Sequence, residues 1–353
     1  MTIENILKKS LLGERLNNQE ALTLLNSPDW YSIAQAAHEK RNQLHSPEKV
    51  TYAAFRVLNY TNFCNIDCTF CSFKDDVESD RGYTLTLEQI AEKAEHTLSK
   101  GVYEIFFQGG VNPSLPLKYY TDAFEILSQK YRMNIRGLSP VEVMRLAEKE
   151  GLSVTQLLSI LKKSGLNSVP GAGAEILTES MRQILSPKKL SAEDWCSVMG
   201  DAHKIGLKGS SNIVFGSVET PKDVVEHFNF IREQQDKTGG FLSFIPWVFQ
   251  PQTKRFKVRY VKKWEYLRLL AVSRLYFDNI PHIEASILVM GKDIAEMALH
   301  CGANDMSSIV LEENVLKSYG IRTLEGAEKF ISNAGFTPQR RTMDYEPLTV
   351  ASK

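Results

Sequence analysis

Cysteine is scarce in this chain and poorly placed for disulfides. Only five cysteines occur in 353 residues, and three of them fall between positions 64 and 71. A secreted disulfide framework needs an even set of cysteines at regular spacings. The first twelve residues carry Glu4 and two lysines and lack the uninterrupted apolar core of a signal peptide. We therefore expect reduced thiols and a cytoplasmic protein.

Excess charge and long apolar runs are also missing. Forty-two basic residues balance forty-two acidic ones, so the formal net charge is zero. No whole-protein field then attracts nucleic acid or anionic lipid, and we expect neither partner. The longest apolar runs, such as 244–249, are far shorter than the roughly 20 residues that cross a bilayer. The sequence predicts no contact with a membrane.

The chain does contain a regular alternation of short β-branched and aromatic runs with amphipathic helical stretches. This rhythm is typical of parallel βα units, and about eight can be followed. The predicted strands are 53–60, 103–108, 133–138, 167–170, 209–215, 241–246, 282–286 and 304–307. The fold class predicted is α/β, a (β/α)8 TIM-like barrel with an N-terminal helical extension. A doubly wound open sheet is the alternative.

Helices are expected before and after the barrel. Residues 18–25 and 29–45 read as two helices that cover the N-terminal side of the barrel, and Pro47 separates them from the first strand. Further helices are expected at 313–319 and 324–333, followed by an irregular tail from Thr337. The predicted division is an extension over 1–50, a barrel over 51–340 and a tail over 341–353.

Cys64, Cys68 and Cys71 follow the first predicted strand with C-x3-C-x2-C spacing. Chance would produce this spacing in roughly one sequence of this composition in a thousand. Three thiolates can hold a 4Fe-4S cluster and leave one iron open to another donor. A zinc site needs a fourth ligand, but His45 and His96 lie outside the loop. Three buried core cysteines are the remaining alternative.

With Phe70 just before the third cysteine, this loop resembles the radical S-adenosylmethionine superfamily. The resemblance covers about residues 18–347 and is most marked to the menaquinone branch, which uses the futalosine pathway. The run Ile-Pro-Trp-x-Phe-Gln at 245–250 resembles the cyclic dehypoxanthine futalosine synthases, whereas aminofutalosine synthases tend to have a histidine-containing run there. Ala172 and Lys237 depart from the commonest pattern. The other stretches are 108–113, 139–142, 170–177, 215–220, 236–241 and 302–306.

The resemblance implies two cofactors, a substrate and a reductant. A 4Fe-4S cluster on Cys64, Cys68 and Cys71 would bind S-adenosylmethionine and cleave it to a 5′-deoxyadenosyl radical. The implied substrate is dehypoxanthine futalosine, which the radical attacks at carbon 4 of the ribose before ring closure onto the benzoate. An external one-electron reductant such as flavodoxin or ferredoxin is also implied.

Site residues are expected at the C-terminal ends of the strands, where barrel enzymes keep their active sites. A general base is needed, and the candidates are Glu142, Asp305 and His282, with Glu284 also near a strand end. The residues expected to contact the cofactor are Phe70, Gln108, Gly109, Gly110, Ser139, Glu175 and Glu219.

Ordinary structural roles remain open for several of these residues. Gly109 and Gly110 can form a plain turn, and Ser139 can cap a helix. Trp247, Phe249 and Tyr83 can flank the benzoate or simply pack. The residues expected to be structural are Cys196, Cys301, His203 and His227.

Three other functions are alternatives to the cyclase that the resemblance implies. Aminofutalosine synthase uses the same cluster and cofactor, and the deazaflavin-cofactor synthase subunits are expected to be more distant. A non-catalytic iron-sulfur electron carrier is the rival from another class, but a carrier seldom needs a barrel of this size or an open iron.

Overall fold

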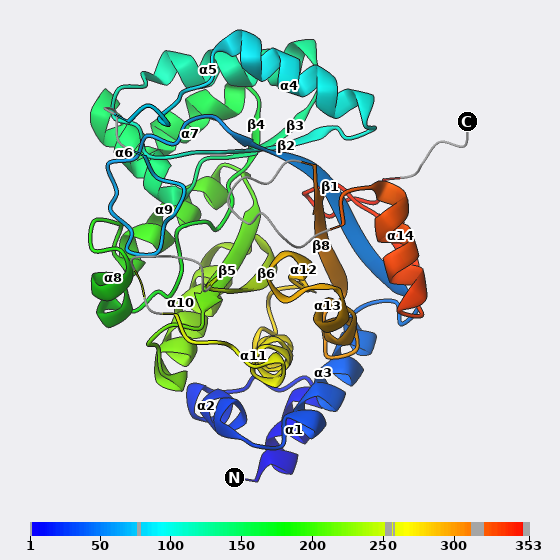
Figure 1. Cartoon of the computed structure of the whole chain (residues 1–353). Coiled ribbons are helices and arrows are strands. Elements are labelled where there is room, and N and C mark those ends of the chain that lie inside the picture. The colour runs from blue at the N-terminus through cyan, green and yellow to red at the C-terminus, as the bar shows by residue number, and fades with distance from the viewer. Residues whose placement is uncertain (1, 76–78, 251–255, 257, 312–320, 349–353) are drawn as a thin grey trace.

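Eight parallel strands form the centre of the molecule in this computed structural model, which describes residues 2–75, 79–250, 256, 258–311 and 321–348 (Figure 1). A ninth strand lies beside the first. The strands are β1 Lys49–Asn59, β2 Glu104–Gln108, β3 Asn134–Gly137, β4 Leu166–Ser168, β5 Gly209–Phe215, β6 Phe241–Val248, β7 His282–Ile283, β8 Asp305–Val310 and β9 Thr337–Arg340.

The strands follow one another around a barrel. One sheet has the order β4-β3-β2-β1-β8 and a second has the order β5-β6-β7. At one seam the N–H of Val169 donates to the carbonyl of Lys208 at 3.3 Å. At the other, Glu284 and Asp305 form a parallel bridge. The consecutive order confirms the predicted barrel and excludes the doubly wound alternative, in which the strand order would reverse.

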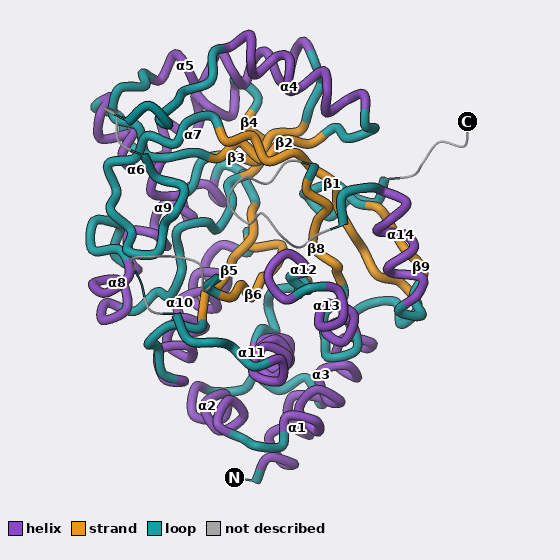
Figure 2. Tube along the Cα trace, viewed as in Figure 1, coloured by secondary structure: helices purple, strands orange, loops and turns teal. Residues whose placement is uncertain are grey.

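Helices separate the strands and cover the outside of the barrel (Figure 2). Local signals set their ends: Thr86 and Gln89 form a capping box at the start of α4, and Gly101, with φ of 69°, follows its end. The helices are α1 Ile3–Leu11, α2 Asn18–Asn26, α3 Trp30–Leu44, α4 Leu87–Ser99, α5 Leu117–Glu125, η1 Ile126–Lys130, α6 Pro140–Glu150, α7 Val154–Lys163, α8 Glu179–Leu185, α9 Ala192–Lys204, α10 Pro221–Thr238, α11 Lys263–Tyr276, α12 Ile287–Met290, α13 Lys292–Leu299 and α14 Leu324–Asn333.

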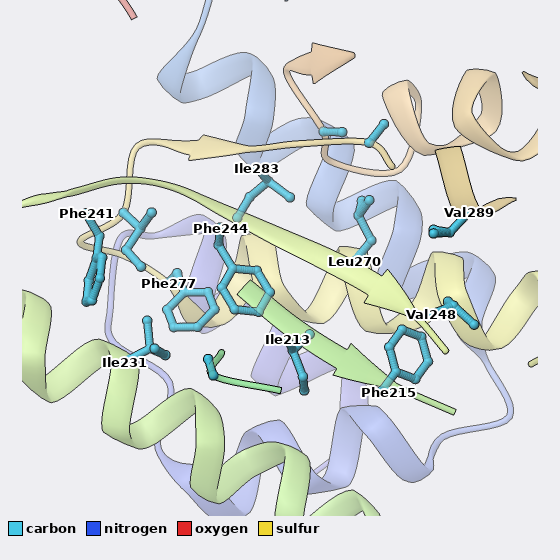
Figure 3. Close-up of a cluster of buried hydrophobic side chains, with 14 of the residues drawn as sticks. Ile213, Phe215, Ile231, Phe241, Phe244, Val248, Leu270, Phe277, Ile283 and Val289 are labelled. Carbon is cyan, nitrogen blue, oxygen red and sulfur yellow. The ribbon is translucent and has the colours of Figure 1, made fainter. Parts of the chain in front are cut away.

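Apolar side chains fill the space between the strands and the helices that cover them. Figure 3 shows this packing on the side of β5, β6 and β7. Phe244 on β6 packs against Phe277, which follows α11, with ring centroids 4.6 Å apart and ring planes tilted by 42°, and both rings are buried. Large aromatic side chains contribute most of the hydrophobic stabilisation in such layers. This packing holds the strands rigidly and fixes where their ends lie.

The N-terminal helices pack mainly on α10 and α11 (Figure 1). The helix α3 reaches the N-terminal end of the barrel, since Arg41 donates to the carbonyl of Lys49, the first residue of β1, and His45, just after the helix, contacts the carbonyl of Pro281 at 2.7 Å. The predicted helices 18–25 and 29–45 are confirmed as α2 and α3, whereas α1 was not predicted. The expected covering of the barrel end is thus supported for α3.

The C-terminal segment departs from the prediction. Residues from Thr337 were expected to be irregular, but Thr337–Arg340 form β9 and pair with the first residues of β1. Just beyond β9, the guanidinium of Arg341 is buried against Asp305 at the N-terminal end of the barrel. The division at 340 and 341 stays a prediction, and the helix predicted at 313–319 lies outside the described residues.

All eight predicted strands exist; β5 has the predicted bounds, 209–215, and the bounds of the other seven are shifted. The predicted strand 304–307 has the wrong bounds, because β8 starts at Asp305 and continues to Val310. Likewise β7 ends at Ile283 rather than at 286. The first correction matters because β8 runs on to Val310 and leaves Asp305 at the start of the strand, whereas His282 opens β7 as it opened the predicted strand.

Candidate active site

The three clustered cysteines lie in the loop that follows β1, at the C-terminal end of the strands. Two backbone hydrogen bonds tie this loop to the turn after β2: Gly110 N–H donates to Thr61 at 2.9 Å, and Asn65 N–H donates to Val111 at 3.0 Å. On its other side, Thr69 N–H donates to the carbonyl of Leu185, the last residue of α8. The loop is therefore anchored by two neighbouring parts of the barrel.

The glycine pair after β2 is explained by the close approach of this loop. A Cβ at Gly110 would lie 2.1 Å from the carbonyl oxygen of Phe63 and 2.9 Å from Cβ of Cys64. A Cβ at Gly109 would lie 2.7 Å from the ring of Tyr60. Both positions therefore need glycine for packing, whether or not they also contact a cofactor.

The three thiols suit a cluster better than a single ion. Within the described residues, no three His, Cys, Asp or Glu side chains converge on one metal position. A zinc ion would need its thiolates about 4 Å apart, whereas each thiolate of a 4Fe-4S cluster binds a different iron. Burial raises the pKa of Cys68 to about 12. Only a bound metal centre would then hold this buried sulfur as a thiolate.

Beside the loop lies a group formed by Phe70, Phe249, Glu175 and Lys189. Phe70 and Phe249 meet edge to face with centroids 5.1 Å apart, and the Lys189 ammonium lies 5.4 Å above the Phe70 ring. Lys189 also pairs with Glu175 Oε1 at 2.8 Å. Glu175 Oε2 is buried and has no hydrogen-bond partner in the protein. A buried acceptor in this state is a ready contact for a bound molecule.

Lys189 was missed by the sequence analysis. It follows Lys188 in a polar stretch after α8, so its composition suggests an exposed surface. Its ammonium is nevertheless enclosed, because Glu175 compensates the charge. The attraction of Glu175 and Cys68 outweighs burial and raises the pKa of Lys189, which therefore stays protonated.

Glu142 and Ser139 form a capping box at the start of α6. Ser139 donates its backbone N–H and its hydroxyl to Glu142 Oε2 at 2.7 and 2.6 Å, and the Tyr60 hydroxyl donates to Oε1 at 2.7 Å. Burial raises the pKa of Glu142 despite these donors. The structure therefore places Glu142 under the cysteine loop, with both oxygens engaged by protein donors.

Glu219 and Gln108 lie near other strand ends. Glu219 accepts hydrogen bonds from the N–H groups of Gly216 and Ser217 at 2.8 and 2.7 Å, so it holds the turn after β5. Gln108 is the last residue of β2, and its carbonyl accepts from Tyr60 N–H at 3.3 Å. The structure thus shows Glu219 holding a turn and places Gln108 at the C-terminal end of β2.

Asp305 and His282 are placed at the opposite end of the barrel. Asp305 pairs in register with Thr51, and Asn59, where β1 ends before the cysteine loop, is roughly 25 Å farther along at about 3.3 Å per residue. His282 opens β7 and stacks on Tyr345 with centroids 3.8 Å apart. Glu284 joins this group by accepting from the Tyr345 hydroxyl at 2.6 Å. The structure does not bring these residues together with Glu142.

The remaining candidates have packing contacts. Trp247 lies half-buried in β6, and the Tyr83 hydroxyl donates to the carbonyl of Asn59 at 3.2 Å. His227 is buried and its Nδ1 accepts from Leu177 N–H at 3.1 Å. His203 contacts Thr238 at 2.7 Å. Cys196 and Cys301 are also buried.

Comparison with known proteins identifies the class of this site. Residues 58–231 match the Radical SAM superfamily, and residues 238–353 match the CofH/MqnC C-terminal region. Methylornithine synthase superposes with a TM-score of 0.72 at 18% identity, covering 95% of this chain and 97% of its own. The hydrogenase maturase HydG gives 0.74 at 15% identity, covering 97% and 76%. These likenesses support the fold.

Curated relatives match over almost the whole chain. The cyclic dehypoxanthine futalosine synthase of Halalkalibacterium halodurans is 36% identical, covering 98% of this chain and 95% of its own, and that of Streptomyces coelicolor is 34% identical, covering 99% and 89%. The 5-amino-6-(D-ribitylamino)uracil–L-tyrosine 4-hydroxyphenyl transferase of Methanopyrus kandleri is also 36% identical, covering 91% and 90%. The expectation that the tyrosine-using branch is more distant is therefore wrong.

The chain belongs to the radical SAM superfamily, in the group that shares the CofH/MqnC C-terminal region. It is accordingly an enzyme that uses a 4Fe-4S cluster and S-adenosylmethionine, and the three thiols and the buried acceptor on Glu175 fit these cofactors. None of the helices among the described residues is long and apolar enough to span a membrane.

Proposed function

We propose that this enzyme converts dehypoxanthine futalosine to cyclic dehypoxanthine futalosine, a step of menaquinone biosynthesis. One observation carries the choice. The Ile-Pro-Trp-x-Phe-Gln run typical of that family places Phe249 in edge-to-face contact with Phe70, which precedes Cys71. The run therefore stands beside the cysteine loop, where it can shape the substrate's surroundings. Relatives named for this activity support the proposal.

Cofactor binding is assigned to the C-terminal end of the barrel. Cys64, Cys68 and Cys71 would hold the cluster, and the charged pair of Glu175 and Lys189 stands where it can orient the S-adenosylmethionine. The other proposed cofactor contacts are Phe70, Gln108, Gly109, Gly110, Ser139 and Glu219. An external flavodoxin or ferredoxin is the proposed reductant.

The cofactors, when bound and reduced by one electron, supply methionine and a 5′-deoxyadenosyl radical. The substrate gives up the hydrogen at carbon 4 of its ribose, so that 5′-deoxyadenosine forms. The ribose radical then bonds to the benzoate ring, and the product forms with loss of one electron, which returns to the enzyme, and one proton. Since the substrate loses two hydrogens in total, S-adenosylmethionine is the net oxidant and the electron balance closes.

The protein's own residues orient the substrate and do not themselves break its bonds. The barrel wall must hold the ribose carbon near the ring carbon, because ring closure has to be faster than escape of the radical. Of the predicted bases, Asp305 and His282 lie at the far end of the barrel from the cysteine loop. We therefore propose no proton transfer by either of them during ring closure.

The transferase reaction is the second candidate. It is favoured by the relative of Methanopyrus kandleri, which matches this chain at 36% identity. That enzyme, by its name, uses tyrosine and 5-amino-6-(D-ribitylamino)uracil. The two candidates share the cluster and the cofactor and differ in substrate.

The discriminating experiment offers both substrate sets to one preparation. Protein reconstituted with iron and sulfide without oxygen is reduced, mixed with S-adenosylmethionine, and given either dehypoxanthine futalosine or tyrosine with 5-amino-6-(D-ribitylamino)uracil. Mass spectrometry should find the cyclised product and one 5′-deoxyadenosine per turnover with the first set only. Product from the second set alone would establish the transferase instead.

Cysteine variants provide the matched control. Cys68→Ala should lose the cluster and all product, whereas Cys196→Ala, a buried cysteine on α9, should keep both. Loss of iron from Cys196→Ala to the same extent would contradict the ligand assignment.

A further inference from the structure

Tyr60 and Glu142 form a buried pair beneath the cysteine loop. The Tyr60 hydroxyl donates to Glu142 Oε1 at 2.7 Å, and the two residues are 0% and 5% exposed. Among the described residues, Glu142 has no Lys or Arg in ion-pair contact; its donors are neutral groups. A buried carboxylate arranged in this way is costly to keep and needs a structural or functional reason.

The pair connects the ends of three adjacent strands. Tyr60 directly follows β1 and Ser139 follows β3, and both donate to Glu142; the turn after β2 is reached through the Tyr60 hydroxyl, which lies 3.4 Å from the carbonyl oxygen of Gly110. The strands concerned are neighbours in the order β3-β2-β1. The Tyr60 and Glu142 pair therefore links these three strand ends.

Tyr60 also supports the glycine turn directly. Its ring leaves no room for a Cβ at Gly109, and its hydroxyl lies 3.4 Å from the carbonyl oxygen of Gly110. Phe107 stacks on the ring at 4.4 Å with an interplanar angle of 12°, so the ring has little freedom to move. The turn formed by residues 109–111 thus rests on a buried, closely packed tyrosine.

That turn presents a hydrogen-bond donor to one of the cluster ligands. The backbone N–H of Val111 points at Cys64 Sγ at 3.3 Å, and Gly110 N–H and Val111 carbonyl bind the loop on either side of Cys64. Hydrogen bonds to ligand sulfurs are among the factors that set the reduction potential of an iron-sulfur cluster. An N–H donor draws charge from the sulfur and favours the reduced cluster.

We propose that Tyr60 and Glu142 are positioning residues: they hold the 109–111 turn so that Val111 N–H donates to Cys64 and sets the cluster's reduction potential. This assigns Glu142 a role other than the general base predicted from sequence. The inference depends on Cys64 being a cluster ligand but not on the identity of the substrate. It can therefore stand if the cyclase assignment fails.

The test is a redox titration of the reconstituted holoenzyme, in which the electron paramagnetic resonance signal reports the amount of reduced cluster at each potential. Tyr60→Phe keeps the ring and removes only the hydroxyl that contacts Glu142 and Gly110. The ratio of reduced to oxidised cluster at a fixed solution potential should fall at least threefold, about 28 mV at 59 mV per tenfold. Iron content should remain that of the parent enzyme.

Two further variants make the result specific. Tyr119→Phe removes a hydroxyl from the same aromatic group, one that donates to the carbonyl of Leu85, and should leave the ratio unchanged. Val111→Pro removes the N–H itself and should lower the ratio as Tyr60→Phe does. The double variant that carries both Tyr60→Phe and Val111→Pro should show no further fall in the ratio of reduced to oxidised cluster, because both changes remove the same hydrogen bond to Cys64.

The measured potentials of these variants either support or overturn the proposed positioning role. An unchanged potential in fully loaded Tyr60→Phe, or additive shifts in the double variant, would overturn it. If Tyr60→Phe does not fold, the potential of Val111→Pro against the parent decides whether this hydrogen bond matters.

Discussion

The guanidinium of Arg341 donates to both carboxylate oxygens of Asp305, with Nη2 2.9 Å from Oδ1, although 36 residues separate the two in sequence. Arg341 is 2% exposed and Asp305 is fully buried. Glu284 lies 3.7 Å from the same guanidinium, so one cation serves two carboxylates. This arrangement holds the segment after β9 inside the N-terminal end of the barrel.

Replacing Arg341 should destabilise the protein severely. Arg341→Met keeps much of the apolar stem but leaves Asp305 and Glu284 buried without a cation, for which we expect a loss of about 3–5 kcal/mol. Urea unfolding followed by circular dichroism measures this. Arg145→Met, which breaks an exposed pair with Glu148, should cost less than about 0.5 kcal/mol. Equal losses would show that burial of the pair is unimportant.

A methyl group at Gly110 should displace the cysteine loop. Gly110→Ala would put Cβ 2.1 Å from the Phe63 carbonyl, a backbone atom that cannot yield without moving Cys64. We expect less than half the parent's iron after reconstitution, measured per folded chain. Gly151→Ala is the control, since it has positive φ but an open surrounding, and it should cost about 1 kcal/mol of stability while keeping full iron.

Loss of Lys189 should weaken cofactor binding. Lys189→Met leaves Glu175 without its cation and frees its side chain beside Phe70. Removal of a residue that orients a ligand group costs about tenfold to a hundredfold in affinity, so the Kd for S-adenosylmethionine should rise by at least about tenfold. Equilibrium dialysis of the reconstituted protein measures it. Lys188→Met, on the exposed neighbour, should match the parent.

Stability should fall as the pH drops below 6.5, partly through His227. Burial lowers the pKa of His227 from 6.5 to about 3. Between these values the unfolded chain binds a proton that the folded chain does not, so the free energy of unfolding falls by up to about 1.4 kcal/mol per pH unit. His227→Gln should flatten this slope between pH 6 and about pH 4 in urea titrations. A slope equal to the parent's would mean that folded His227 carries a proton.

The order of the eight strands could be predicted because each is a short apolar run bounded by helix signals. Thr86 and Gly101, for example, mark the limits of α4 from local chemistry alone. The cysteine loop could be predicted for the same reason, since the spacing of its three cysteines is a property of contiguous residues. These features need no knowledge of distant contacts.

Other parts of the site depend on contacts that no local pattern records. Asp305 was expected near the end of a strand, but a run buried along its whole length gives no period from which to read where β8 begins. Lys189 follows another lysine and looks like surface until Glu175 is brought beside it. Thr337–Arg340 form a strand only because β1 offers them a partner.

The segment after β9 covers the N-terminal end of the barrel. Arg341, Met343 and Asp305 are almost entirely shielded from solvent there, so we expect small molecules to enter and leave at the rim that carries the cysteine loop. The molecule that binds deepest would then bind first and leave last. An ordered sequence of binding and release is therefore the expected consequence of this C-terminal segment.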